Sequence, residues 1–281
     1  MKKLTPYILL LPCTIFLVVT LGFGVIQGFL QSLGFIPSLG MEEITFKYYI
    51  QLFKEPDFIE SLIFSLKTSL ISSVLAVIIG VFLAYMLFKH ESKTNNLIMK
   101  IPVIIPHMVT VLIVISIFST GGYLSRILYN LSIIKDSSSF PLLVNDKLGI
   151  GIIIAYLWKE VPFVAIITYG ILSNINKDLI LASRNLGAND TQVFTKILLP
   201  LSKKSIITSF IIILAFSFGA FEVPYLLGPT TPKALPVKAF IEYSSPDLFN
   251  RPYAMAINTI LALISLILIV FYERAFRKAL K

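Results

Sequence analysis

The sequence predicts an all-α membrane protein with six transmembrane helices in one transmembrane domain spanning residues 1–281. Of its 281 residues, 56% are hydrophobic and only 14% are charged, whereas soluble domains carry about 25% charged residues. A helix that crosses about 30 Å of hydrocarbon needs roughly 20 mostly apolar residues. Six runs meet this requirement, at about residues 4–29, 62–88, 101–123, 148–172, 205–227 and 252–272.

The first run follows Lys2 and Lys3 in the manner of a secretory signal peptide. It continues to Phe29 without a convincing small-residue cleavage site, so we expect it to be retained as a helix. A lipoprotein signal is disfavoured because Pro12 precedes Cys13 where a small residue is expected. Because Cys13 is the only cysteine, a disulfide-stapled secreted fold is excluded.

The distribution of Lys and Arg predicts the orientation of the six spans, since cytoplasmic loops carry an excess of these residues. Fourteen lie on one side, in residues 1–3, 89–100, 173–204 and 273–281. Eight lie on the other side, in residues 30–61, 124–147 and 228–251. We therefore expect both termini to be cytoplasmic and the protein to be a multi-pass protein of the cell's inner membrane. The net charge of +9 then reports topology and contact with lipid, not a nucleic-acid partner.

The inner segment 173–204 is the longest cytoplasmic connection and is locally amphipathic. Its pattern predicts two short helices separated by a turn at Gly187, which favours the positive φ that ends a helix. Asn189 and Gln192 have the spacing of a capping box for the second helix, and Pro200 is expected to interrupt that helix before the fifth span. Periodicity alone leaves two interpretations: a knob that docks a soluble partner, or an interfacial helix that anchors the loop.

Four charges fall inside the predicted spans, and such residues usually face a cavity or a partner. Lys159 and Glu160 lie near the middle of the fourth span and point about 100° apart, so we expect at least one to face a translocation path or a partner subunit. A structural bridge to another span is the alternative. Glu222 is a candidate for the outer gate or a solvated helix end. For Lys67 we expect its amine to snorkel outward.

No motif for catalysis or metal binding appears in the sequence. It has no phosphate-binding loop of the G-x-x-x-x-G-K-[ST] type, so any ATP must be bound by another chain. His90 and His107 are the only histidines, which leaves no clustered metal site. We expect neither a catalytic residue nor a metal ligand, and we expect His107 to be a packed residue.

The run Leu181-Ala182-Ser183-Arg184-Asn185-Leu186-Gly187-Ala188, followed by Phe194, Ile197, Leu199 and Pro200, resembles the EAA loop of binding-protein-dependent ABC importer permeases. The span count, loop placement and length are similar to those of type I importers. In that family the loop is a coupling helix that sits in a cleft of the ATPase. The resemblance thus implies an ATPase-coupling role for a set of six residues: Ala182, Ser183, Gly187, Ala188, Phe194 and Pro200.

One position departs from the family pattern, because Leu181 stands where the family has a glutamate. We expect either a weaker grip on the ATPase or compensation by a second, heterologous permease with an intact loop. A further stretch, Phe221 to Pro229 followed by Ala234 to Val237, looks like permeases of the polyamine subgroup and their relatives for ferric ion, thiamine or aminoethylphosphonate.

The resemblance implies a permease subunit that forms the pathway for a small polar solute such as a polyamine. Its implied partners are an ABC ATPase dimer that binds ATP and Mg²⁺, a second permease and an extracytoplasmic binding protein, while this chain binds no cofactor and is not an enzyme. Candidate path residues are Lys159, Glu160 and Glu222. The main alternative is a proton-coupled secondary transporter that uses Glu160 or Glu222 as a relay.

Overall fold

The computed structural model describes residues 5–90, 92–136 and 139–279, so Lys2, Lys3 and Lys281 of the charge count lie outside the described residues. Within these ranges the β pairing is an isolated bridge between Ile36 and Met41. Six described helical segments are long and apolar enough to cross a membrane, which confirms the predicted fold class. They are Leu9–Ser32, Pro56–Lys89, His107–Asn130, Ile150–Leu172, Asp190–Gly219 and Leu248–Phe271.

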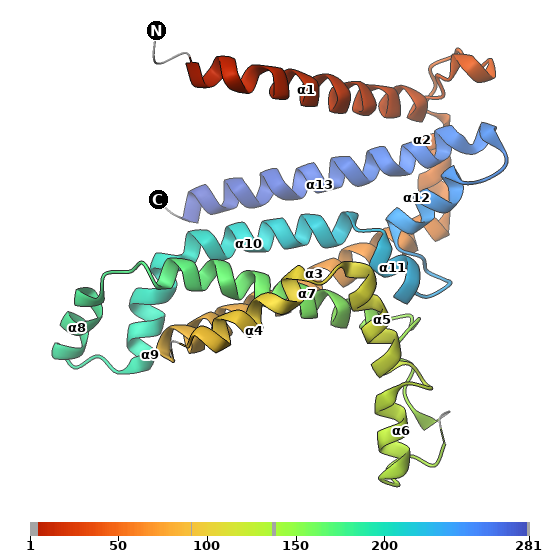
Figure 1. Ribbon diagram of the computed structural model, residues 1–281. Helices are drawn as coiled ribbons and strands as arrows, with labels where there is room; N and C mark the ends of the chain where they lie inside the picture. Colours follow the sequence, from red (N-terminus) through yellow and green to blue (C-terminus); the bar gives the residue numbers. More distant parts are fainter. Residues whose placement is uncertain (1–4, 91, 137–138, 280–281) are drawn as a thin grey trace. The chain divides into compact units, whose positions relative to one another are not determined.

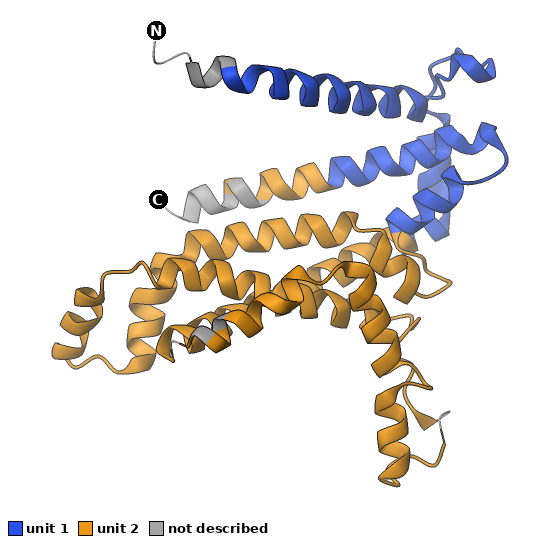
Figure 2. Cartoon of the chain, viewed as in Figure 1, with its two compact units in different colours: residues 1–59, 235–264 blue, residues 60–234, 265–281 orange. Residues whose placement is uncertain are grey.

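The helices divide between two compact units, one of residues 1–59 and 235–264 and one of residues 60–234 and 265–281 (Figure 2). Helices α3 and α13 each contribute to both. In chain order the α-helices are α1 (Thr5–Ser32), α2 (Lys47–Lys54), α3 (Pro56–Lys89), α4 (Lys93–Ile104), α5 (His107–Phe118), α6 (Tyr123–Asn130), α7 (Ile150–Leu172), α8 (Lys177–Asn185), α9 (Asp190–Val193), α10 (Leu199–Gly219), α11 (Glu222–Leu227), α12 (Leu235–Tyr243) and α13 (Arg251–Ala279).

Polar contacts around Glu55 tie together the first unit. Its carboxylate accepts a hydrogen bond from the Tyr253 hydroxyl on α13 and lies 3.9 Å from the Lys238 amine on α12. Ser32, at the end of α1, is 2.6 Å from the Tyr49 hydroxyl on α2. Short helices lie in all three segments on the predicted outer side: α2 in residues 30–61, α6 at the start of residues 124–147 and α12 in residues 228–251.

In the second unit, α3 presents a stripe of small residues at helical spacing. The stripe consists of buried serine, threonine, alanine and glycine positions, and several of its hydroxyl groups donate to the helix's own carbonyls, as Ser69 Oγ does to Ser65 O at 2.7 Å. Small residues let two membrane helices approach closely. A core cluster of Ala76, Val81, Val161, Val164 and Ile213 joins α3, α7 and α10. Figure 1 shows α4, α7 and α10 side by side in this unit.

The third span differs from the single helix predicted at about 101–123. The chain forms α4 up to Ile104, breaks at Ile105 and Pro106, and continues as α5 from His107 to Phe118. Ile105 has extended backbone dihedrals, φ −64° and ψ 129°, which the residue before a proline favours. A second break at Ser119 to Gly122 separates α5 from α6.

The fifth span also departs from its predicted bounds of about 205–227, and the expected interruption at Pro200 is wrong. Helical structure runs from Asp190 to Gly219 without a break, because Phe194 to Leu198 form a π-helical turn directly before α10. A π turn adds a residue to the helix, so it absorbs the carbonyl clash that a proline causes. The helix ends instead at Ala220, whose ψ of 137° is extended, and α11 follows.

Candidate functional site

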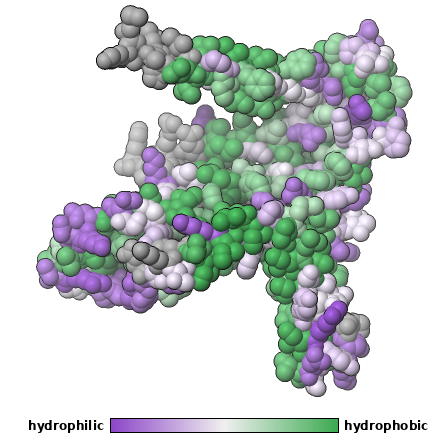
Figure 3. Space-filling model, in the orientation of Figure 1, coloured by the Kyte–Doolittle hydropathy of each residue, from purple (hydrophilic) through white to green (hydrophobic). Residues whose placement is uncertain are grey.

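The segment between α7 and α10 forms two short helices joined by a tight turn, as the sequence predicts. Gly187 adopts φ +87°, and Asn189 and Gln192 form a complete capping box: the Gln192 amide donates to Asn189 Oδ1 at 2.8 Å, and the Asn189 amide donates to Gln192 Oε1 at 2.9 Å. A second cap begins α8, where the Asp178 amide donates to Asn176 Oδ1 at 2.9 Å. Figure 3 shows hydrophilic side chains over α8 and α9 and hydrophobic ones over the helices beside them.

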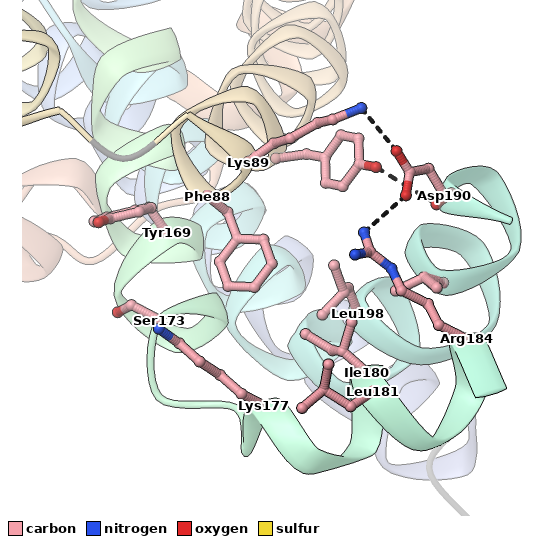
Figure 4. A pocket seen from close by; sticks show the side chains of 12 residues that line it. Phe88, Lys89, Tyr169, Ser173, Lys177, Ile180, Leu181, Arg184, Asp190 and Leu198 are labelled. Atoms are coloured by element: carbon pink, nitrogen blue, oxygen red, sulfur yellow. Dashed lines mark hydrogen bonds and ion pairs between the residues drawn. The ribbon is translucent and has the colours of Figure 1, made fainter. Parts of the chain in front are cut away.

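An ion-pair node at Asp190 fixes this segment to α3. The Asp190 carboxylate accepts from the Lys89 amine at 2.7 Å and from the Arg184 guanidinium at 2.9 Å, and Tyr85 donates to the Asp190 carbonyl at 3.4 Å. All three side chains of the ion pairs are about half exposed, so water screens both pairs and they contribute little to stability. The ion pairs instead position this segment, because α3, α8 and α9 meet at the Asp190 carboxylate (Figure 4).

Beside this node lies a notch of about 380 Å³ enclosed by α3, α7, α8 and the start of the fifth span. Leu181, the residue in place of the family glutamate, lines the notch together with Phe88 and Tyr169 (Figure 4). The floor is apolar, since Leu172, Val193 and Leu198 form a buried cluster with Ala84 of α3. Three cations also line the notch, namely Lys89, Lys177 and Arg184.

The six residues predicted to couple to an ATPase separate into two groups. Ala182 and Gly187 are exposed, whereas Ser183 is half-buried and donates to Ile180 O at 2.7 Å. Ala188 and Phe194 pack against the buried cluster instead. Pro200 is exposed within the continuous helix of the fifth span.

Two side chains that the six-residue set omits dominate the outer face of α8. Leu179 is 51% exposed and Leu186 is 89% exposed, and together with Ala182 they follow one helical stripe. Their counterpart Ile180, one position away, is half-buried against the cluster. The helical spacing of the sequence alone could not show which face of this helix is exposed.

We expect Asn189→Ala to loosen the turn between α8 and α9, because it removes the acceptor of one capping-box bond. Loss of an N-cap costs about 1 kcal/mol. Limited proteolysis of the solubilised protein should then cut residues 186–192 several-fold faster. The control is Thr191→Ala, which lies two residues further along the chain. It should leave the cleavage rate near that of the parent protein.

The intramembrane charges on α7 both reach other helices. The Lys159 amine donates to the carbonyl oxygens of Val103, at 3.2 Å, and Ile105, where α4 breaks before Pro106. Glu160 is buried, and one carboxylate oxygen accepts from Ser217 Oγ on α10. Both side chains thus make the bridges to other helices that the sequence left open as an alternative to a path role.

These two residues line a cavity of about 230 Å³ with His107 and Phe216. The His107 ring lies over Phe216, with centroids 5.0 Å apart, and the electrostatic environment of His107 includes both Lys159 and Glu222. Glu222 is exposed in the first turn of α11, which packs against α5 and α7. Lys159 and Glu160 thus line one cavity, whereas Glu222 is not among the described residues that line it. Ser217 was missed because a lone serine in an apolar run carries no signal.

The geometry defines a class: a multi-span helical membrane protein with a structured polar element at one end of its bundle and a charged cavity between its helices. Residues 62–281 match the family of binding-protein-dependent transport system inner membrane components. The chain belongs to this family. It is a multi-pass permease subunit of an ABC importer, a transport subunit in a family where a separate chain hydrolyses ATP.

Individual relatives agree with this assignment. The spermidine/putrescine transport system permease protein PotB of Haemophilus influenzae is 30% identical over 236 residues, which cover 83% of this chain and 79% of PotB. PotB of Escherichia coli is 28% identical over 227 residues, covering 79% and 80%. A crystal structure of a bacterial ABC transporter that imports the acidic polysaccharide alginate contains a chain of the same fold. Its TM-score is 0.83 at 21% identity, with coverage of 100% of this chain and 97% of that one.

Proposed function

We propose that the chain forms one half of the translocation pathway of an ATP-driven polyamine importer, with both termini in the cytoplasm. Its partners in this proposal are a pair of ABC ATPase chains that bind ATP and Mg²⁺, a second permease, and an extracytoplasmic binding protein that delivers the cargo. PotB relatives named for spermidine and putrescine support the cargo class. Structures titled as a methionine ABC transporter and as an alginate transporter with its periplasmic protein support the assembly.

The observation that carries the proposal is the outward face of α8. An apolar side chain that is 89% exposed, Leu186, sits beside the Gly187 turn on an element fixed to α3 by ion pairs. A stripe of exposed apolar side chains on a capped element that is otherwise polar is typical of a contact with another protein. We propose that α8 docks into a cleft on the ATPase. Closure of the ATPase pair when nucleotide binds would then move α8 and the fifth span attached to it.

Leu181 supports a heterologous second permease. Its side chain lines the apolar notch and is 57% exposed, so this chain offers no carboxylate at the position where the family pattern has one. In the proposed pair, the other permease keeps that carboxylate, and the two coupling loops grip the ATPase unequally.

The decisive experiment is co-purification of the ATPase in mild detergent with a tagged Leu186→Glu variant. We expect at least a tenfold loss of bound ATPase, because a buried glutamate would carry an unpaired charge into the interface. The control is Leu142→Glu, which changes a leucine that is also exposed, 59%, but lies on the predicted outer side. Undiminished ATPase binding by Leu186→Glu would overturn the docking role of α8.

A further inference from the structure

The cavity beside α7 contains a buried acid whose hydrogen bonding is incomplete. Glu160 is 4% exposed, and its Oε1 accepts from Ser217 Oγ. Its Oε2 is buried and has no hydrogen-bond partner among the described residues. A buried carboxylate oxygen without a donor is costly. Glu160 lines the cavity, so a donor bound in the cavity would satisfy this oxygen.

The neighbouring cation does not fill this position, although Lys159 directly precedes Glu160 in the chain. Its amine is engaged by the carbonyl oxygens of Val103 and Ile105, which hold it toward the broken end of α4. The serine on the other side is also committed, because Ser217 supplies the bond to Oε1 and its carbonyl accepts from the Tyr156 hydroxyl at 3.2 Å. The carboxylate is thus rigidly held and still lacks one donor.

Besides Lys159 and His107, the cavity has aromatic and apolar walls that suit an organic cation. Phe163 and Phe216 line it together with apolar side chains of α10, and aromatic faces attract ammonium groups. Phe216 and Ile212 are each 47% exposed on this chain, so the cavity opens to the surface of the unit. A volume of about 230 Å³ holds one end of an extended alkylamine but not a sugar chain.

We propose that Glu160 forms a binding subsite for the primary ammonium group of an alkylamine cargo, with Ser217 as its positioning residue. The ammonium would donate to Oε2 while its methylene chain lies against Phe216 and Phe163. The inference rests on the proposed function for the transport context and assigns to one carboxylate the recognition of the cargo's charge inside the membrane.

The test uses the complex of this chain with its ATPase and partner permease. The complex is reconstituted in lipid nanodiscs for the binding assay and, together with the binding protein, in liposomes for the uptake assay. Radiolabelled putrescine is the probe, and its binding is measured without the binding protein. Glu160→Gln keeps the shape and the bond to Ser217 but removes the charge. We expect at least tenfold weaker putrescine binding and at least tenfold slower ATP-driven uptake, with the complex still assembled.

Matched variants separate charge from structure. Glu160→Asp should retain part of the binding, because the charge remains on a shorter side chain. Glu60→Gln, an exposed acid on α3, should bind putrescine like the parent complex. Normal uptake and binding by Glu160→Gln would overturn the subsite while leaving the importer assignment intact. Putrescine binding that depends on Glu160 in a complex that does not transport putrescine would uphold the subsite and overturn the proposed cargo.

Discussion

Replacing Gly80 with leucine is expected to prevent recovery of folded permease. A Cβ atom at position 80 of α3 would lie 2.8 Å from Val164 Cβ and 2.9 Å from the Val161 carbonyl oxygen of α7. The second contact is with backbone, which cannot rotate away, so the two helices must separate. Overpacking of a core costs about 1–3 kcal/mol, and a leucine at this helix crossing should reach at least the upper end of that range.

The measurement is the monodisperse yield and thermal midpoint of the detergent-solubilised protein. Gly22→Leu is the control, since a Cβ at that position of α1 meets no atom within 4 Å and leucine favours a membrane helix. We expect the control to keep the yield of the parent protein. A stable Gly80→Leu protein with an unchanged midpoint would show that α3 and α7 do not pack at Gly80.

Lys159→Met is expected to destabilise the protein by about 2 kcal/mol, through loss of the donor to two carbonyl groups at the α4 break. Lipid offers no replacement donor, and each unsatisfied buried polar group costs about 1–3 kcal/mol. The cost of placing the Lys159 charge in the membrane applies to separated and packed helices alike, so it largely cancels. The loss of contacts with Val103 and Ile105 therefore decides the sign.

A thermal unfolding series in detergent, with ATP-driven uptake in parallel, tests this expectation. Lys67→Met is the control, because Lys67 is the other intramembrane lysine and is exposed on α3; it should change the midpoint little. Lys159→Arg keeps hydrogen-bond donors and should fall between the two. Full stability with lost uptake in Lys159→Met would instead assign this lysine to the translocation path.

Most of the fold could be predicted from local patterns in the sequence. Runs of about 20 apolar residues predict the six spans, and the capping box at Asn189 is local, so its residues alone specify it. Gly187 is also local, because a positive φ favours glycine whatever surrounds it. These features require no knowledge of which helices meet.

The rest depends on contacts between segments far apart in the chain. Pro200 looks like a helix breaker, yet a π turn that packs Phe194 against Tyr85 of α3, with ring centroids 4.5 Å apart, carries the helix through it. Likewise Ser217 and Glu160 are 57 positions apart, so their pairing has no local signature. The charges of α7 were visible in the sequence, but their partners were not.

The unbroken helical path from Asp190 to Gly219 makes the fifth span a lever. At about 1.5 Å per residue its 30 residues extend roughly 45 Å, so a tilt of about 5° at the α8 end displaces the far end by roughly 4 Å. Ser217 lies near the Gly219 end of this helix, whereas Glu160 belongs to α7. A tilt that begins at the α8 end would therefore draw the Ser217 hydroxyl away from the Glu160 carboxylate and change how tightly that carboxylate holds a charge.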